Sequence, residues 1–182
     1  MFKRILVAVF AVLAAPSAAQ DITIPMHQIG NGSIITIRTD TNNIFLYRIL
    51  GQTGPDQYVY ETFNGNRAVG APAWVNYTDS FGNLVARVDA RGGITSWSPH
   101  RCNRTLGTCS YTELRPDGSQ AHFTRVTSPI VGGFSYILYD STGAVAVSGQ
   151  AILNELGWTQ WGTSQRQNEA ATTVEILSAH YQ

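Results

Sequence analysis

Hydrophobic and polar residues alternate along most of this chain, in short segments separated by turn residues. In residues 33–39, for example, isoleucines alternate with a threonine and an arginine. This period of two is typical of a β-strand with one buried face. The separating segments place glycine close to aspartate or asparagine, as in residues 89–93 and 115–119, and those residues favour tight turns. The pattern predicts short antiparallel strands joined by hairpins.

We expect an all-β fold, an antiparallel meander of about eight to ten strands that closes into a barrel or folds into a sandwich. Residues 44–50 are apolar on both faces, so that strand should be covered on both sides. In the strand around residue 87, Leu84, Ala86 and Val88 are expected on one face, opposite Arg87. The predicted strands are residues 33–39, 44–50, 58–63, 84–90, 94–97, 110–114, 121–127, 134–139, 144–147 and 172–176, with a short strand or extended crossing at 68–76.

The pattern is less regular near the C-terminus. Ser148 is suited to cap a short helix near residues 149–156, and Gly157 follows where helices often end, but a continued strand fits the same residues. Residues 163–169 read as a polar loop. In a barrel, the last strand would pair with the first and remove both exposed edges.

The spacing of tyrosine, aspartate and glycine in residues 77–82, and again in 139–143, resembles the tyrosine-aspartate repeats of large bacterial shell-forming toxins. The resemblance covers a small part of the chain, which is far too short to form such a shell. We carry no function across from it.

The first nineteen residues resemble a secretory signal peptide. Lys3 and Arg4 precede the apolar run of residues 5–15, and small residues stand before Gln20. That run is shorter than the roughly 20 residues of a spanning helix, so no transmembrane segment is expected after cleavage. We therefore expect a signal peptide at 1–19 and a single β-rich domain at 20–182, located in the periplasm or secreted, and the lysine-free remainder suggests a bacterial source.

The charge balance argues against nucleic-acid binding, and the two cysteines predict one disulfide. Removal of the leader leaves fewer basic than acidic side chains, so the chain has no electrostatic footprint for nucleic acid. Cys102 and Cys109 are the only cysteines, and in an oxidising compartment such a pair is expected to form one disulfide. The bond would close a short loop and act as a local staple.

Catalytic and metal-binding patterns are weak. No Gly-x-Ser-x-Gly elbow, phosphate-binding loop or clustered histidines occur, so we assign no catalytic residue, no metal ligand and no cofactor. A small hydrolase would need two carboxylates close together. Most acidic residues fall in predicted turns, which leaves Glu61 and Glu113, on strands, as the notable exceptions.

The aromatic residues carry the leading functional hypothesis, because they occur on nearly every predicted strand and are typical of ligand pockets. We expect a non-enzymatic binding module that holds a small apolar or aromatic ligand in a barrel. A structural or protein-interaction domain of the cell envelope is the alternative, and the aromatics could instead fill the barrel completely. The candidate ligand contacts are Tyr58, Tyr60, Trp97, His100, Arg101 and Tyr136.

Overall fold

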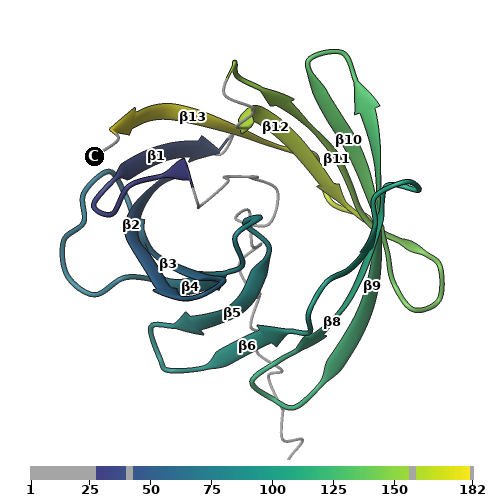
Figure 1. Ribbon diagram of the computed structural model, residues 1–182, viewed down its shortest axis with the longest axis horizontal. Helices are drawn as coiled ribbons and strands as arrows, with labels where there is room; N and C mark the ends of the chain where they lie inside the picture. Colours follow the sequence, from purple (N-terminus) through teal and green to yellow (C-terminus); the bar gives the residue numbers. More distant parts are fainter. Residues whose placement is uncertain (1–27, 40–42, 156–158, 181–182) are drawn as a thin grey trace, which may run out of the picture.

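The computed structural model describes residues 28–39, 43–155 and 159–180, which form thirteen antiparallel β-strands (Figure 1). The predicted all-β antiparallel meander is confirmed. The strand count exceeds the prediction because residues 101–103 and 159–166, for which no strand is predicted, also pair with their neighbours. The strands are β1 (Ile34–Thr39), β2 (Ile44–Gly54), β3 (Gln57–Asn64), β4 (Trp74–Thr78), β5 (Leu84–Asp89), β6 (Ile94–Trp97), β7 (Arg101–Asn103), β8 (Thr108–Leu114), β9 (Gln120–Ile130), β10 (Gly133–Tyr139), β11 (Val145–Leu153), β12 (Thr159–Arg166) and β13 (Thr172–His180).

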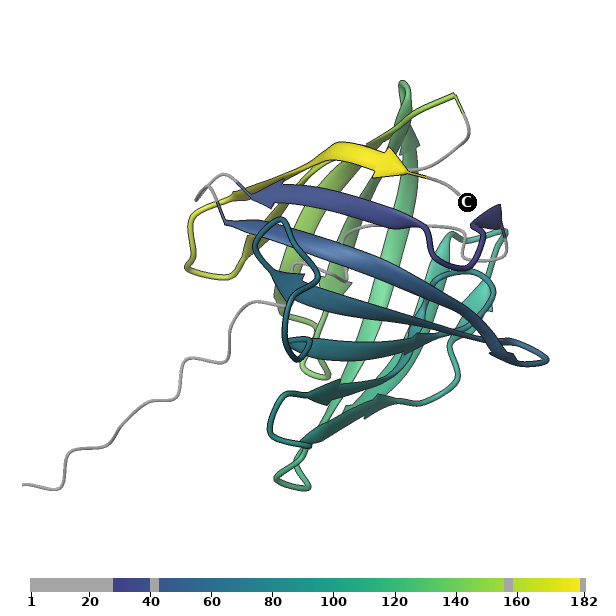
Figure 2. The ribbon, with the colours of Figure 1, turned by 90° about the vertical axis from the view of Figure 1, so that its left-hand side faces the viewer.

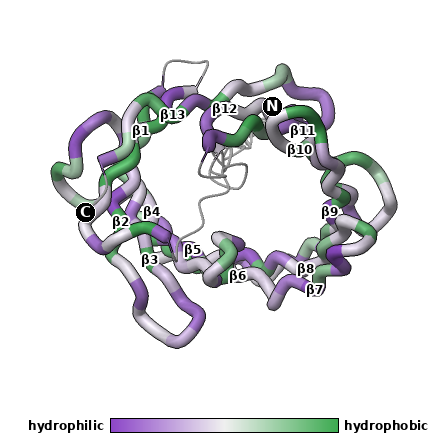
Figure 3. Tube along the Cα trace, turned by 45° about the horizontal axis from the view of Figure 1, so that its top comes forward, coloured by the Kyte–Doolittle hydropathy of each residue, from purple (hydrophilic) through white to green (hydrophobic). Residues whose placement is uncertain are grey.

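The strands close into a barrel. Most strands pair with the next one in the chain, and β1 pairs with β13, as expected for a closed meander. β6 and β7 follow one another along the same edge of β8, and the pairing of β6 with β8 completes a ring of twelve strands. Figure 3 shows this ring, and in side view the strands run obliquely around its wall (Figure 2). Of the barrel and the sandwich that the sequence allows, the barrel is the fold adopted.

Inward-facing apolar side chains form two separate clusters among the described residues. The first apolar cluster lies on one part of the wall and consists of Ile29, Ile35, Ile37, Tyr47, Ile49, Tyr60 and Val174. The second apolar cluster lies on another part and consists of Leu84, Trp97, Tyr111 and Leu138. Directly paired residues of neighbouring strands share a face, so the register places each further side chain inside or outside the wall.

The strand β2 is buried on its inner face and only partly covered on its outer face, where Leu50 is exposed, so the predicted cover on both sides is incomplete. Tyr47 and Ile49 belong to the first apolar cluster, while Leu46 faces outward and is also buried. Its cross-strand partner Phe63 lies under the guanidinium of Arg48, 5.0 Å from the ring centroid. The outer face is therefore shielded in part by a long polar side chain, whose stem covers apolar surface.

In the C-terminal third the continued strand forms instead of the alternative short helix, and the predicted polar loop is wrong in its first part. No helix forms at 149–155, because β11 continues to Leu153 and Ala151 pairs with both Phe134 and Gly162; residue 156 lies outside the described residues. The predicted loop at 163–169 begins as part of β12, which ends at Arg166. In both places the neighbouring strands supply hydrogen-bonding partners on two edges, and this outweighs the weak local pattern.

The prediction for β5 is also wrong in its side-chain faces. Leu84 pairs with Thr78 while Ala86 pairs with Tyr77, so one residue between them is extra and forms a bulge. Consecutive residues of β4 point to opposite faces, and Leu84 and Ala86 therefore do so as well. Beyond the bulge Arg87, and not Ala86, lies on the inner face with Leu84.

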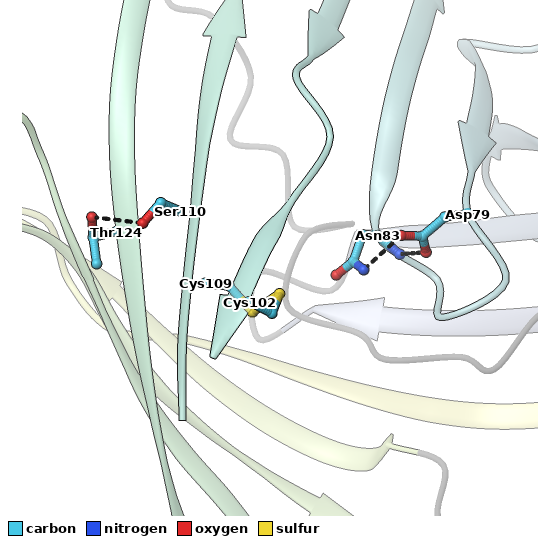
Figure 4. Close-up of a disulfide and its surroundings, with 6 residues drawn as sticks. All are labelled: Asp79, Asn83, Cys102, Cys109, Ser110 and Thr124. Atoms are coloured by element: carbon cyan, nitrogen blue, oxygen red, sulfur yellow. Dashed lines mark hydrogen bonds between the residues drawn. A yellow bond between two sulfur atoms is a disulfide. The ribbon is translucent and has the colours of Figure 1, made fainter. Parts of the chain in front are cut away.

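Three hairpin turns share one hydrogen-bonding pattern, which confirms the predicted turn chemistry. The first turn residue is Asp79, Asp89 or Asp140, and its Oδ1 accepts from the backbone N–H groups two and four residues later. A glycine with φ of 82–83° occupies the fourth position of each turn, where a side chain would be strained. Figure 4 shows Asp79 with Asn83. These carboxylates are occupied locally by their own turns.

Cys102 and Cys109 form a disulfide, as predicted, between facing residues of β7 and β8 whose Cα atoms are 4.0 Å apart (Figure 4). The bond joins the short strand β7 to the barrel. No helix in the described part of the chain is long and apolar enough to cross a membrane. The predicted signal peptide lies outside the described residues.

Candidate functional site

The predicted contact residues lie at three different places. Tyr58 and Tyr60 pack in the first apolar cluster, Trp97 is part of the second, and the ring of His100 stacks on Tyr111 of that second cluster. Tyr136 is buried on the inner face of β10, whereas Arg101 is exposed on the outside. The structure therefore brings Trp97 and His100 to one part of the barrel interior and separates Arg101 from them.

Aromatic rings line the inner wall around Tyr111. The ring centroids of His100 and Tyr111 are 4.5 Å apart, and those of Tyr111 and Phe123 are 5.7 Å apart. Trp97 donates from Nε1 to Glu113 at 3.2 Å. These tilted contacts are typical of stable aromatic pairs, and they build a firm apolar surface across β6, β8 and β9.

Arg87 enters the interior from β5, beyond the bulge. Its Nε donates to Asn76 Oδ1 at 2.8 Å, and the fully buried Asn76 donates in turn to Thr62. Its guanidinium carbon lies 5.7 Å from the ring centroid of Trp74 and 5.8 Å from that of Trp97. Two aromatic faces thus stabilise a partly buried cation.

The buried phenol of Tyr60 lies near this cation. Burial raises the pKa of Tyr60 to about 12, and the positive charge of Arg87 opposes the shift. The hydroxyl therefore stays protonated at neutral pH. It can act as a hydrogen-bond donor toward the barrel interior but not as a base.

Four buried polar atoms in the described part of the chain have no hydrogen-bonding partner: Thr78 Oγ1, Arg87 Nη2, His100 Nδ1 and Arg125 Nε. We call these four residues the inner polar set. Each borders the second apolar cluster: Thr78 pairs with Leu84, Arg87 lies over Trp97, His100 stacks on Tyr111, and Arg125 pairs with Leu138. Buried polar atoms are nearly always satisfied, so their concentration around one cluster marks a candidate binding site.

The electrostatics of this site hold His100 neutral. Burial lowers the pKa of His100, the positive charge of Arg125 lowers it further, and the negative charge of Asp79 acts in the opposite direction. Because the folded-state pKa is below the 6.5 of the unfolded chain, the unfolded state binds a proton first as the pH falls. The contribution of His100 to stability is therefore present above pH 6.5 and is lost as the pH falls toward the folded-state pKa.

We expect NMR titration to report a His100 pKa below 6.5 in the folded protein, because burial and Arg125 disfavour the imidazolium. Arg125→Met should raise that pKa, and Asp79→Asn should lower it further. Arg38→Met, on the outer face, serves as the control and should leave the titration unchanged. An unshifted His100, or the same pKa with and without Arg125, would contradict the proposed surroundings of this ring.

A pocket of about 360 Å³ lies on the outside of the wall, where residues 98–100 bridge β6 and β7. Ser98 accepts from the backbone N–H of Thr112 at 2.8 Å, and the hydroxyl of Thr112 lies 3.3 Å from Nδ1 of His122. Arg101 lines the pocket and faces solvent. Its lining residues are Ser98, Pro99, Arg101, Ser110, Tyr111, Thr112 and His122.

The two acidic residues singled out on strands do not form a pair. Glu61 faces outward and binds Arg48, with 2.7 Å between Arg48 Nε and Oε2. Glu113 faces inward and accepts from Trp97 and Arg115. They lie on opposite faces of the wall, so they cannot flank one substrate bond. Among the described residues there is no group of three or more His, Cys, Asp or Glu side chains that could hold a metal ion.

Three members of the inner polar set were not selected from the sequence: Thr78, Arg87 and Arg125. An arginine on a strand can be assigned to the barrel interior only when the face of the strand on which it lies is known. The face of Arg87 depends on the bulge, and that of Arg125 on its register with Leu138. His100 alone was selected in advance.

Comparison with protein-family models, with curated proteins and with solved structures finds no match to this chain. The function is therefore inferred from the barrel and its side chains alone.

Proposed function

We propose that the protein is an exported, non-enzymatic binding protein that holds a small apolar or aromatic ligand inside its barrel. The observation that carries the proposal is the ring of twelve strands with aromatic side chains on its inner face. An interior of about eight strands is just wide enough for side chains to fill, and the diameter grows with strand number. Two separate apolar clusters, instead of one continuous core, agree with an interior that side chains do not fill.

Charged side chains on the outer face of the barrel indicate that this face contacts water. Arg38 and Glu175, paired across β1 and β13, form an ion pair of 2.7 Å with both side chains about half exposed. Arg48 and Glu61 form another between β2 and β3. Charged groups in mid-strand positions are costly against lipid, so we assign the inner face to the ligand and the outer face to solvent. The disulfide agrees with an oxidising compartment outside the cytoplasm.

Binding of the neutral fluorescent probe N-phenyl-1-naphthylamine tests the proposal. We expect saturable binding to the purified protein with a rise in probe fluorescence. Val147, beside the second apolar cluster, gives an inward variant, Val147→Trp, which should weaken binding at least tenfold by occupying the interior. Ile137→Trp on the outer face is the matched control and should bind like the wild type. Absence of saturable binding to the wild type, or equal binding by both variants, would overturn the proposal.

The envelope-interaction alternative has one observation in its favour. Leu106, in the loop between Cys102 and Cys109, is 67% exposed. The same loop lies near Phe81, which is 60% exposed, because the guanidinium of Arg104 is 5.4 Å from the Phe81 ring. Exposed apolar groups beside a cation are found at protein contacts. A wild type that binds no probe but forms a specific photo-cross-link from position 106 would favour this function instead.

A further inference from the structure

We propose that Arg125 and His100 bind the oxyanion end group, a carboxylate or a phosphate, of an otherwise apolar ligand. The inference rests on the proposed function and names the chemical class of its ligand. Both residues flank the ring of Tyr111: His100 stacks on it, and Arg125 follows Phe123, the direct partner of Tyr111, by two positions along β9. Such diagonal neighbours are about 7–8 Å apart, within reach of a long side chain.

The inward direction of Arg125 follows from the register. Arg125 pairs with Leu138 of β10, a buried member of the second apolar cluster, and with Cys109 of β8. Its neighbour Thr124 points the other way and meets Ser110 (Figure 4). The side chain of Arg125 therefore lies beside the apolar surface of the interior, where its Nε is buried without a partner.

Arg125 is half-buried with its Nε out of contact with water, and such a guanidinium favours a negative partner because burying part of a charge is costly unless it is paired. No ion pair to Arg125 occurs in the described part of the chain. Two carboxylates near the second apolar cluster are already engaged: Asp79 accepts three hydrogen bonds within its own turn, and Glu113 accepts from Trp97 and Arg115. A ligand oxyanion is the partner that would complete the site.

His100 adds a second donor. Its buried Nδ1 has no partner, and the charged groups that act on the ring are Arg125 on β9 and Asp79 in the turn between β4 and β5, while Tyr111 packs on its face. A bound anion would favour the imidazolium, so binding should take up a proton at His100. Affinity for an anionic ligand should therefore rise as the pH falls from 7.5 to 5.5.

The neighbouring side chains determine the rest of the ligand. Phe123 lies 5.7 Å from Tyr111 between ring centroids, and Leu138 is the partner of Arg125. Both are apolar and share the inner face with the two donors. The site thus fits an amphiphile whose charged end meets Arg125 and His100 and whose chain or ring lies on Phe123 and Leu138.

The test is displacement of N-phenyl-1-naphthylamine by decanoate, decyl phosphate and neutral decanol, with inorganic phosphate as the head group alone. The wild type should bind decanoate and decyl phosphate at least tenfold more tightly than decanol, the range expected for hydrogen bonds to a charged group. Inorganic phosphate should compete at least a hundredfold more weakly than decyl phosphate, because it lacks the apolar part. Equal competition by the two phosphates would overturn the amphiphile assignment.

Arg125→Met should abolish the preference for the anion, to within about twofold, and leave decanol binding unchanged. His100→Gln should keep a reduced preference and lose its pH dependence. Arg38→Met, on the outer face, is the matched control and should keep the preference. Retention of the preference in Arg125→Met, or its loss in Arg38→Met, would overturn the assignment.

Different binding results would overturn the proposed function and the oxyanion site. A wild type that binds the probe, decanol and decanoate equally would overturn the oxyanion site and leave the ligand-holding barrel intact. A wild type that binds neither the probe nor any of the decyl compounds would overturn the barrel function itself.

Discussion

Replacing Gly149 by alanine is expected to lower the free energy of unfolding by about 3 kcal/mol. Gly149 on β11 lies opposite Tyr136, and a Cβ at this position would be 2.2 Å from the backbone oxygen of Thr163 and 2.6 Å from the Tyr136 hydroxyl. A backbone carbonyl in a strand cannot move without disturbing the pairing of β11 with β12. The methyl group therefore causes overpacking that no side-chain rotation relieves.

Urea denaturation of the variant measures this effect, with Gly54→Ala as the matched control. Gly54 also lies on a strand, but an added Cβ would be 3.6 Å from its nearest neighbour, an ordinary contact. We expect the control to change stability by less than about 0.5 kcal/mol. Equal stability of Gly149→Ala and Gly54→Ala would show that Tyr136 does not lie over Gly149 as described.

The fold was predictable from the sequence to the extent that local chemistry sets it. The turns at Asp79, Asp89 and Asp140 follow from an aspartate that binds its own backbone and a glycine that accepts a positive φ. Alternation then assigns the strands between them. Neither signal reports which distant strands meet, so the sequence left barrel and sandwich open: the pairing of β1 with β13 was expected only for a barrel, and that of β6 with β8 was not predicted.

The errors fall where long-range pairing competes with local pattern. Residues 149–153 carry apolar spacing compatible with a helix, but Ala151 has strand partners on both sides. In β5, a bulge absorbs one residue and reverses the faces that simple alternation assigns to Ala86 and Arg87. A bulge has no marker in this segment, so the inward direction of Arg87 could not be predicted.

The candidate site could be predicted only in part from the sequence, for the same reason. Trp97 and His100 were selected for their chemistry, and the structure places Trp97 in one apolar cluster with Tyr111 and the ring of His100 against Tyr111. Arg125 became informative only when its register with Leu138 placed it inside the barrel without a carboxylate partner. A charge on a strand is ordinary on the outer face and expensive on the inner face, and sequence alone does not distinguish the faces of β9.

Trp97→Ala is expected to lower the free energy of unfolding by about 3–5 kcal/mol, the range for truncating a buried tryptophan. Trp97 is almost fully buried in the second apolar cluster, its Nε1 donates to Glu113, and the guanidinium of Arg87 lies over its ring. It also stands at the seam of the barrel, since β6 and β8 share only two residue pairs, Ser96 with Leu114 and Trp97 with Glu113. Truncation therefore removes packing between β6 and β8, the neighbouring strands of the barrel that share the fewest residue pairs.

The seam gives this prediction a second, local readout. Backbone amides of residues 96–98 should exchange with solvent much faster in Trp97→Ala, whereas those of β9, which shares seven residue pairs with β8, should change little. Trp97→Phe should retain most of the stability and lose about 1 kcal/mol with the bond to Glu113. Phe81→Ala removes an aromatic ring that is 60% exposed and is the control, with an expected loss below about 0.5 kcal/mol. If Trp97→Ala lowers the free energy of unfolding no more than Phe81→Ala, then Trp97 does not stabilise the closure of the barrel. The packing described for the second apolar cluster would then be wrong.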